Sequence, residues 1–365
     1  MVDVFSICYL FTIIPKGREY SMMKHTQNMI KNNFQYFFSF SEASGIISGV
    51  MTALIIILAI ILICLILFAL VIDWMTRYAY DRKSPKLPKF LVNTLMGHSL
   101  ADDEERKRIR GQAAELKERA SQKILMTSYD GTKMAGHFLP CENAKRLVVA
   151  VHGWRSGWNY DYRTLAPFLH DHETAVLMIE LRGHGESGDR YLYYGKKERF
   201  DIAEWTKLAA TELAKDLPIY VIGMSAGALS TLMSTTAGLH ENTKGVIVDS
   251  CAGSARALGM SVVKNLGVNP RLIYPFIRFD ARLRLGMDDN AYTGFDAIQG
   301  NQLPILFIHG TKDRVADIHS MQKLYDNCKT AKFQLIVEGA DHTKSCFVDP
   351  ERYQKALLDF FDFCE

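Results

Sequence analysis

One serine of the chain stands in a pattern that suits nucleophilic chemistry. Residues Gly223–Gly227 read Gly-Met-Ser-Ala-Gly, so Ser225 has a glycine two positions before it and another two positions after it. An apolar, β-branched run, Ile219–Ile222, precedes this motif, and a run of small residues, Ala226–Gly238, follows it. A strand, a sharp turn and a helix in this order form a nucleophile elbow, which lifts the serine Oγ above the edge of a sheet. The pattern therefore predicts that Ser225 is a nucleophile, rather than only the cap of the following helix.

A serine hydroxyl is nearly inert without a base, and His342 is the candidate for that role. It follows the last apolar run of the chain, Phe333–Val337, in a Gly-Ala-Asp-His loop. Three other histidines compete with it. His309 stands at a strand end, where buried histidines with satisfied nitrogens are common, and His184 belongs to a glycine-rich loop. His152 follows an earlier strand, and we expect it to be structural.

The base needs an acid that holds its ring in the productive tautomer. Asp313 follows the apolar run Ile305–Ile308 and a glycine, so it can accept a hydrogen bond from Nδ1 of the histidine. Asp317, four residues further along, is the alternative acid. Asp341 precedes the histidine directly, and we expect it to shape that loop.

Short apolar runs alternate with helical segments from residue 124 onward. Ile124–Tyr129 and Lys133–Leu139 flank an Asp-Gly pair, which predicts a hairpin. The later runs are continuous in Val, Ile and Leu, which is typical of strands buried on both faces in a mostly parallel sheet with flanking helices. The expected strands are Leu147–Val151, Val176–Ile179, Ile219–Ile222, Val246–Val248, Ile305–Ile308 and Phe333–Val337. The expected helices are Trp158–His170, Lys197–Asp216, Ser225–Gly238, Val315–Cys328 and Pro350–Phe363.

An apolar segment near the N-terminus predicts a membrane anchor. Ala43–Ile72 contains no charged residue, and its second part, Ala53–Ile72, is almost wholly apolar. That length crosses a hydrocarbon core of about 30 Å. A signal peptide would be shorter and would end at a small-residue cleavage site, and a buried helix would show a polar face. We therefore expect one uncleaved transmembrane helix.

Basic residues around this segment bear on its orientation. Five basic residues lie close enough to its C-terminal end to affect its orientation: Arg77, Arg82, Lys83, Lys86 and Lys89. Only Lys31 lies equally close to its N-terminal end. The positive-inside rule then places the C-terminal domain in the cytoplasm. Lys24, Arg18 and Lys16 lie further out and weaken this contrast.

Four sequence blocks together resemble the α/β-hydrolase superfamily over roughly residues 120–365. His152-Gly153-Trp154 resembles the family's oxyanion loop, and Glu180–Ser187 is similar to its D-x-R-G-x-G-x-S loop, with Glu180 in place of the usual Asp. The serine motif is the third block, and the fourth consists of the acid and histidine loops, Ile308–Asp313 and Gly339–His342. The resemblance is greatest to single-span, membrane-anchored bacterial serine hydrolases, which are described as esterase-like or peptidase-like. It implies an α/β-hydrolase fold with a small cap.

The resemblance also implies an oxyanion hole, made by the backbone N–H groups of Trp154 and Ala226. In this family an insertion at 251–300 usually forms a cap over the nucleophile, and its apolar residues here favour an acyl or aromatic substrate group. The alternative is an apolar face that only covers the sheet. Arg271, Arg278, Arg282 and Arg284 suit a carboxylate or phosphate, or else form a solvated cationic face.

The expected organisation follows from these segments. Residues 1–42 form an N-terminal segment without an assigned role, and residues 43–72 form the transmembrane helix. A Pro-Lys linker and a charged helix over Asp102–Gln122 occupy residues 73–122, and residues 123–365 form the α/β-hydrolase domain, with its cap at about 251–300.

Composition narrows the function further. The formal net charge is +3 and the charges are mixed along the chain, so no nucleic-acid footprint is present. The seven cysteines show no Cys-x-x-Cys or Cys/His ligand spacing, which argues for free thiols and against a metal site.

We predict a membrane-anchored serine hydrolase that cleaves a small-molecule carboxylic ester through an acyl-enzyme, without metal or cofactor. A serine peptidase or an acyltransferase on the same residues, or a membrane-tethered binding module with a decayed site, are the alternatives.

Overall fold

The structure, a computed structural model, describes residues 19–84, 103–120, 122–288 and 291–365. Residues 1–18 of the expected N-terminal segment, 85–102 of the expected linker and 289–290 of the expected cap lie outside these ranges. The chain divides into two compact units, residues 1–70 and residues 71–365. The two units are described separately below.

The described part of the first unit is a single helix. Helix α1 (Glu19–Tyr80) contains 62 residues, the last ten of which belong to the second unit. Large apolar side chains are exposed along it from Ile46 to Leu70. The helix contains a stretch long and apolar enough to cross a membrane. It extends beyond the expected range of 43–72 at both ends because the sequence has no proline between Pro15 and Pro85 to stop it.

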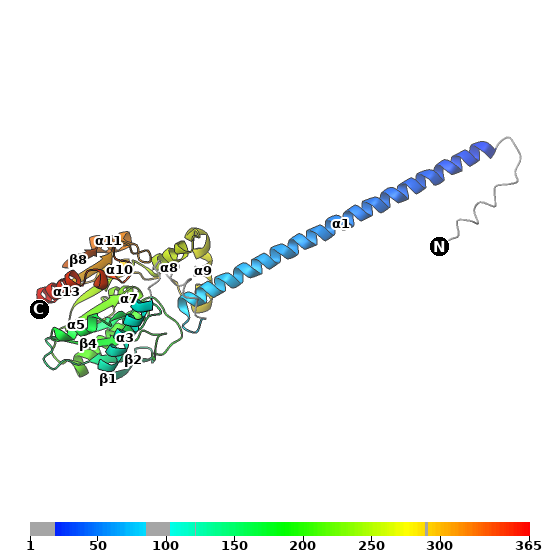
Figure 1. The fold of residues 1–365 in the computed structure, drawn as a ribbon. Helices are drawn as coiled ribbons and strands as arrows, with labels where there is room; N and C mark the ends of the chain where they lie inside the picture. Colours follow the sequence, from blue (N-terminus) through cyan, green and yellow to red (C-terminus); the bar gives the residue numbers. More distant parts are fainter. Residues whose placement is uncertain (1–18, 85–102, 121, 289–290) are drawn as a thin grey trace. The chain divides into compact units, whose positions relative to one another are not determined.

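The second unit is built on one sheet of eight strands (Figure 1). The strands are β1 (Gln122–Thr127), β2 (Lys133–Leu139), β3 (Arg146–Val151), β4 (Thr174–Ile179), β5 (Ile219–Met224), β6 (Thr243–Asp249), β7 (Ile305–Gly310) and β8 (Lys332–Val337). Their order is β1-β2-β4-β3-β5-β6-β7-β8; β1 and β2 pair antiparallel, β2 pairs antiparallel with β4, and all later pairs are parallel. This confirms the predicted hairpin followed by six parallel strands. The strand order reverses between β3 and β5, and open parallel sheets bind ligands at the carboxyl ends of the strands at such a point.

Helices cover both faces of the sheet because the strand residues alternate between two apolar clusters. Val149 and Val151 belong to the first cluster, and Val148 and Ala150 belong to the second. The first is covered by α6 (Glu198–Leu208), a π-helical turn (Ala209–Leu213), α7 (Ala226–Ser234), α10 (Gly294–Gly300) and α11 (Ile318–Asn327). The second is covered by α3 (Asp103–Arg119), α4 (Trp158–Asp161), α5 (Leu165–Asp171), α12 (Ser345–Val348) and α13 (Pro350–Cys364).

The expected helix Trp158–His170 is wrong in one respect, since it is divided into α4 and α5. Pro167 explains the division, because a proline lacks the N–H of a helix interior and is accepted only in a first turn. The break also places Tyr162 next to the carboxyl ends of two central strands, β3 and β5. Its hydroxyl donates to the backbone oxygens of Val151 (2.9 Å) and Ile222 (3.0 Å), so it joins β3 to β5.

The insertion between β6 and β7 holds two further helices, α8 (Ala255–Asn265) and α9 (Pro270–Leu285), which contact each other (Figure 1). The Asn269 side chain caps α9, Pro270 begins it, and Gly286 ends it in the left-handed conformation with φ 61°. These are the residues expected at the two ends of a helix.

The end of α1 packs against this insertion. Ile72 is buried with Val263 of α8 and Ile277 of α9. Further along α1, Tyr80 packs with Ala281 and Met287. The sequence assigns residues 73–122 to a linker and a charged helix, whereas residues 73–84 of that range are an integral part of the second unit.

Polar groups of the second unit bind the last carbonyls of α1. The Trp154 indole N–H and the Tyr194 hydroxyl both donate to the Ala79 carbonyl, at 2.8 and 2.9 Å. The Arg155 guanidinium donates to the carbonyls of Tyr78 (3.1 Å) and Asp81 (2.8 Å). Because the last carbonyls of a helix have no partner within it, these contacts hold the end of α1 against the loop after β3.

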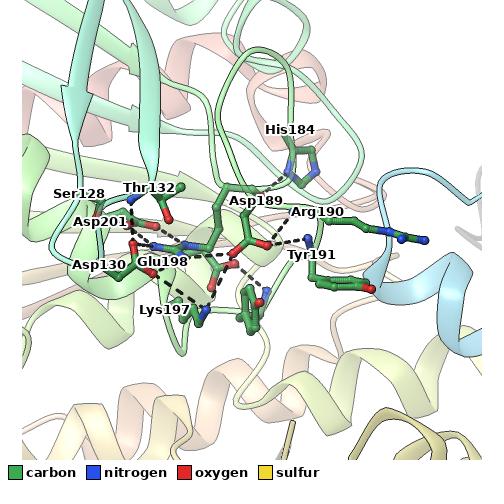
Figure 2. Close-up of polar contacts among 12 residues, drawn as sticks. Ser128, Asp130, Thr132, His184, Asp189, Arg190, Tyr191, Lys197, Glu198 and Asp201 are labelled. Carbon is green, nitrogen blue, oxygen red and sulfur yellow. Dashed lines mark hydrogen bonds and ion pairs between the residues drawn. The ribbon is translucent and has the colours of Figure 1, made fainter. Parts of the chain in front are cut away.

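A buried arginine holds the loop after β4, where the sequence resembles the D-x-R-G-x-G-x-S motif. Figure 2 labels three acidic partners of this arginine, Asp130, Asp189 and Asp201. Arg182 is fully buried and donates to both carboxylate oxygens of Asp201, at 2.7 and 2.6 Å. It also reaches Asp130 of the hairpin turn (2.9 Å) and Asp189 (3.2 Å). Burial alone would raise the pKa of Asp130, but the hydrogen bond from Arg182 holds that pKa well below its usual range. Arg182 therefore ties the hairpin turn and α6 to this loop.

Replacing Arg182 should cost much of the stability of the second unit. We expect Arg182→Met to lower the free energy of unfolding by about 3–5 kcal/mol, because it leaves the buried Asp201 carboxylate without its cationic partner. Urea unfolding of the full chain in detergent micelles, followed by tryptophan fluorescence, measures the change. The control is Arg352→Met, which removes an exposed pair with Asp349 and should shift the midpoint little. Equal midpoints for the two variants would contradict this role of Arg182.

Candidate active site

Ser225 occupies a strained turn between β5 and α7. Its backbone angles are φ 56° and ψ −117°, a region that non-glycine residues rarely adopt. Such strain costs on the order of 1–3 kcal/mol and persists only where surrounding contacts impose it. Here the Ser225 N–H donates to the Asp249 carbonyl at the end of β6 (2.9 Å), and the Ser225 carbonyl accepts from Leu229 in α7 (3.1 Å).

The two glycines of the motif allow the backbone to pass close to its neighbours. A Cβ at Gly223 would lie 2.4 Å from the Gly227 carbonyl oxygen. A Cβ at Gly227 would lie 2.3 Å from the carbonyl oxygen of Val151 and 2.4 Å from that of His152. Only glycine at both positions lets α7 begin against the end of β3, as the spacing of the motif predicts.

The structure brings the three predicted side chains together. The Oγ of Ser225 lies 2.7 Å from Nε2 of His342, and Nδ1 of His342 lies 2.7 Å from Oδ2 of Asp313. The side chains of His342 and Asp313 are almost completely buried, with exposed fractions of 2% and 0%. The three residues follow β5, β8 and β7, whose carboxyl ends meet at one edge of the sheet.

The electrostatics around Asp313 keep it ionised. Burial alone would raise the pKa of Asp313, but the facing His342 and the backbone N–H of Ala316 lower that pKa below its usual value. Its other oxygen accepts from the N–H groups of Val315 and Ala316, both at 2.8 Å. An ionised Asp313 accepts the Nδ1–H of His342, which leaves Nε2 able to take a proton from Ser225.

The competing histidines have structural partners. His309 contacts the Ala316 carbonyl through Nε2 at 2.9 Å, and the same nitrogen lies 3.4 Å from Asp313. Nδ1 of His152 contacts the Gly153 carbonyl (2.8 Å), and His184 accepts from the Arg155 N–H (3.0 Å). Burial lowers the pKa of each of these three histidines, to about 3 for His184.

The two other aspartates considered from the sequence, Asp317 and Asp341, make contacts of a different kind. Asp317 caps α11 by accepting from the His319 N–H at 3.0 Å. The backbone carbonyl of Asp341 accepts from the Lys344 N–H at 3.0 Å. This contact does not involve the Asp341 side chain, so its loop-shaping role stays a prediction.

The loop 152–154 passes directly beside the serine. A Cβ at Gly153 would lie 3.4 Å from the Cβ of Ser225. The Gly153 N–H donates to Asp161 (2.8 Å) and the Arg155 N–H donates to His184, so both neighbours of Trp154 are fixed. Within the described residues, the amide N–H groups of Trp154 and Ala226 donate to no other protein group.

A cavity of about 140 Å³ lies beside Ser225 and Ala226. Its walls are almost entirely apolar and come mainly from the end of α1, the 152–154 loop, and helices α8 and α9, with Tyr194 and Val315 added from two other loops. The side chains that define these walls include Trp74, Tyr78, Trp154, Leu258, Val262 and Ile277. The cavity can hold an apolar group attached to a carbonyl that reaches the serine.

Comparison with known proteins agrees with the fold of the second unit. A sequence model described as the alpha/beta hydrolase family matches residues 148–356. The chain belongs to the α/β-hydrolase family. Among solved structures, the esterase Pf2001 of Pyrococcus furiosus has a TM-score of 0.57 with this hydrolase at 22% identity, over 67% of this chain and 91% of the esterase.

Two curated relatives are described as uncharacterized proteins. YqkD of Bacillus subtilis is 24% identical over 242 residues, which are 66% of this chain and 78% of YqkD. YfhR of Escherichia coli K12 is 22% identical over 254 residues, which are 66% of this hydrolase and 80% of YfhR.

Sequence reasoning missed two features of the site. Trp74 and Tyr78 line the cavity from α1, although they follow the apolar segment and belong to no motif. Asp249, at the end of β6, is fully buried and bonded to Ser250 (3.0 Å) and Tyr353 (3.1 Å). The Ser250 hydroxyl in turn accepts from the Thr343 N–H (3.0 Å), next to the histidine. A lone acid after an apolar run was the available signal for Asp249.

Asp249 should give the stability of the second unit a distinctive dependence on pH. Burial raises the pKa of Asp249 from 3.8 to about 7. Between these values the folded state holds a proton that the unfolded state has lost, so the free energy of unfolding falls as pH rises through this window. We expect Asp249→Asn to remove that part of the slope, which urea midpoints of both proteins from pH 4.5 to 8 would measure. Parallel slopes for the two proteins would show that Asp249 is ionised throughout.

Proposed function

We propose that this α/β-hydrolase is a membrane-anchored serine hydrolase that cleaves carboxylic esters through an acyl-enzyme on Ser225. The observation that carries the proposal is the continuous chain of hydrogen bonds from Ser225 through His342 to Asp313, beside an apolar cavity. This arrangement has the connectivity of a nucleophile, a general base and an orienting acid.

The proposed reaction has two half-reactions. Oγ of Ser225 attacks the ester carbonyl while Nε2 of His342 takes its proton, and the Asp313 carboxylate stabilises the imidazolium that forms. The N–H groups of Ala226 and Trp154 donate to the oxyanion. The tetrahedral intermediate then expels the alcohol, which takes the proton from His342. Water, deprotonated by His342, attacks the acyl-enzyme, and the carboxylic acid leaves as Ser225 recovers its proton.

The shape and chemistry of the cavity favour an ester over a peptide. Apart from the serine, the ring hydroxyls of its tyrosines and the two N–H groups proposed for the oxyanion, its lining offers mainly hydrocarbon and aromatic surface. A peptide main chain needs hydrogen-bond partners when it is buried, whereas an acyl chain needs none. The Pyrococcus furiosus protein of the same fold is described as an esterase, which is consistent with this substrate class.

Single substitutions separate the proposed roles. We expect Ser225→Ala to abolish hydrolysis of p-nitrophenyl butyrate by the full chain in detergent micelles. Asp313→Asn should lower kcat by roughly 10³-fold or more, because an amide favours the wrong tautomer of His342. The matched control is Asp317→Asn, since asparagine caps a helix as well as aspartate and activity should persist. Near wild-type turnover of Asp313→Asn would contradict its role as the orienting acid.

We further propose that α1 is the anchor and that the second unit lies in the cytoplasm. The apolar stretch of α1 and the excess of basic residues on its C-terminal side support this topology. A protease added outside intact cells should leave the second unit whole and should digest it after permeabilisation, as followed with a C-terminal epitope. Digestion in intact cells would place the unit outside.

A further inference from the structure

We propose that α9 lies in the headgroup region of the bilayer, and that the substrate is therefore an ester whose acyl chain enters the cavity from the membrane. This inference rests on the proposed function above and names the substrate class of the same site. Four observations on α9 and the end of α1 carry it.

The first observation is an apolar stripe on the outer face of α9. Leu272, Phe276, Phe279 and Leu283 follow one another at spacings of four, three and four residues, so they share one face of the helix. Their exposed fractions are 65%, 49%, 68% and 73%. The face that carries Tyr274, Ile277 and Ala281 is buried against the rest of the unit. A helix that is apolar on both faces suits a site where one face packs on protein and the other enters lipid.

The second observation is the charge beside this stripe. Arg271 and Arg282 are exposed, and both lie on the same border of the apolar face. Arginines at the border of an apolar helix face are typical of helices that lie flat at a membrane surface, where they meet anionic headgroups. Arg284, on the opposite border of the stripe, instead pairs with Asp280 (2.6 Å) and Asp73 (2.8 Å).

The third observation is the place of α9 along the chain's path out of the membrane. Ile72 ends the apolar segment, and it is buried against Ile277 of α9. Met75, one turn later in α1, packs in the same cluster with Ile273. Contact with the residue that ends the span holds α9 at the level where hydrocarbon gives way to headgroups. Trp74 and Tyr78, on the same part of α1, are residue types enriched at that level.

The fourth observation is that the same elements form the cavity. Trp74, Met75 and Tyr78 of α1 and Tyr274 and Ile277 of α9 line it, together with Ser225. One side of α9 thus faces the cavity region while the other carries the exposed stripe. An acyl chain that leaves the bilayer beside α9 reaches the serine along apolar surface, whereas a freely dissolved ester gains nothing from this placement.

The first test compares two esters on the full chain reconstituted in vesicles of phosphatidylcholine and phosphatidylglycerol. One ester, p-nitrophenyl acetate, is dissolved in water, and the other, p-nitrophenyl palmitate, is dissolved in the vesicles. The double variant Phe279→Ser, Leu283→Ser should lower the rate on the palmitate about fivefold or more, and should leave the acetate rate within about twofold. The control Leu125→Ser removes an equally exposed leucine from β1 and should change neither rate.

The second test locates α9 directly. Phe279→Trp in vesicles that contain brominated lipids should lose the fluorescence that it adds to wild type, whereas Val348→Trp, an exposed site on α12, should keep it. Equal quenching of the two added tryptophans, or shielding of residue 279 from water without lipid quenching, would overturn the placement of α9; the latter result would indicate a second copy of the chain.

The two tests separate the failure of this inference from the failure of the proposed function. A double variant with an unchanged palmitate rate, or with equal losses on both esters, would overturn the membrane route for the substrate. A wild-type protein that hydrolyses neither ester faster than Ser225→Ala would instead refute the proposed function. The lipid quenching of Phe279→Trp would still report the position of α9 in that case.

Discussion

The contact on which the site depends is the imidazole of His342, held between Ser225 and Asp313 at 2.7 Å on either side. Three separate loops must meet within a few ångströms to make it, and they meet because β5, β7 and β8 run parallel and end at one edge of the sheet. Smaller contacts then fix two of these loops. Asp249 receives the Ser225 N–H through its carbonyl, and the Ser250 hydroxyl receives the Thr343 N–H, so β6 holds both the serine turn and the histidine loop.

The end of α1 is bound to the same centre. Trp154 ends the loop that passes Ser225, and Arg155 follows it. Their side chains bind the carbonyls of Tyr78 and Ala79 in α1 and of Asp81 directly after it. Trp154 is thus placed from two directions, by its neighbours' hydrogen bonds to Asp161 and His184 and by its own bond to Ala79. Trp74 and Tyr78 near the end of α1 form part of the cavity wall, so the helix that carries the apolar stretch also contributes to the site.

Short sequence patterns predict the strands, the hairpin and the three candidate catalytic residues. Continuous Val and Ile runs predicted the buried parallel strands, and the Asp130-Gly131 pair predicted the hairpin. The Gly-Met-Ser-Ala-Gly motif and the two late loops single out Ser225, Asp313 and His342 from sequence alone.

Other features depend on contacts that the sequence does not show. Pro167 marks the division of α4 from α5, but the apolar residues on either side of it favour one continuous helix. The packing of Trp74–Asp81 had no local signal, since its contacts lie with residues about 75 to 200 positions away in sequence. Asp249 has a local signal as an acid directly after an apolar run, but its role depends on distant partners, Tyr353 and the Ser225 N–H.

The central claim is that Ser225 forms a covalent intermediate, and mass mapping of a trapped adduct tests it most directly. The folded full chain in detergent micelles would be treated with a fluorophosphonate, digested and analysed by mass spectrometry. The geometry predicts one modified peptide, the one that contains Ser225, and loss of the modification in His342→Ala, because the base is then missing. A folded protein without an adduct, or with the adduct on another serine, would contradict the claim.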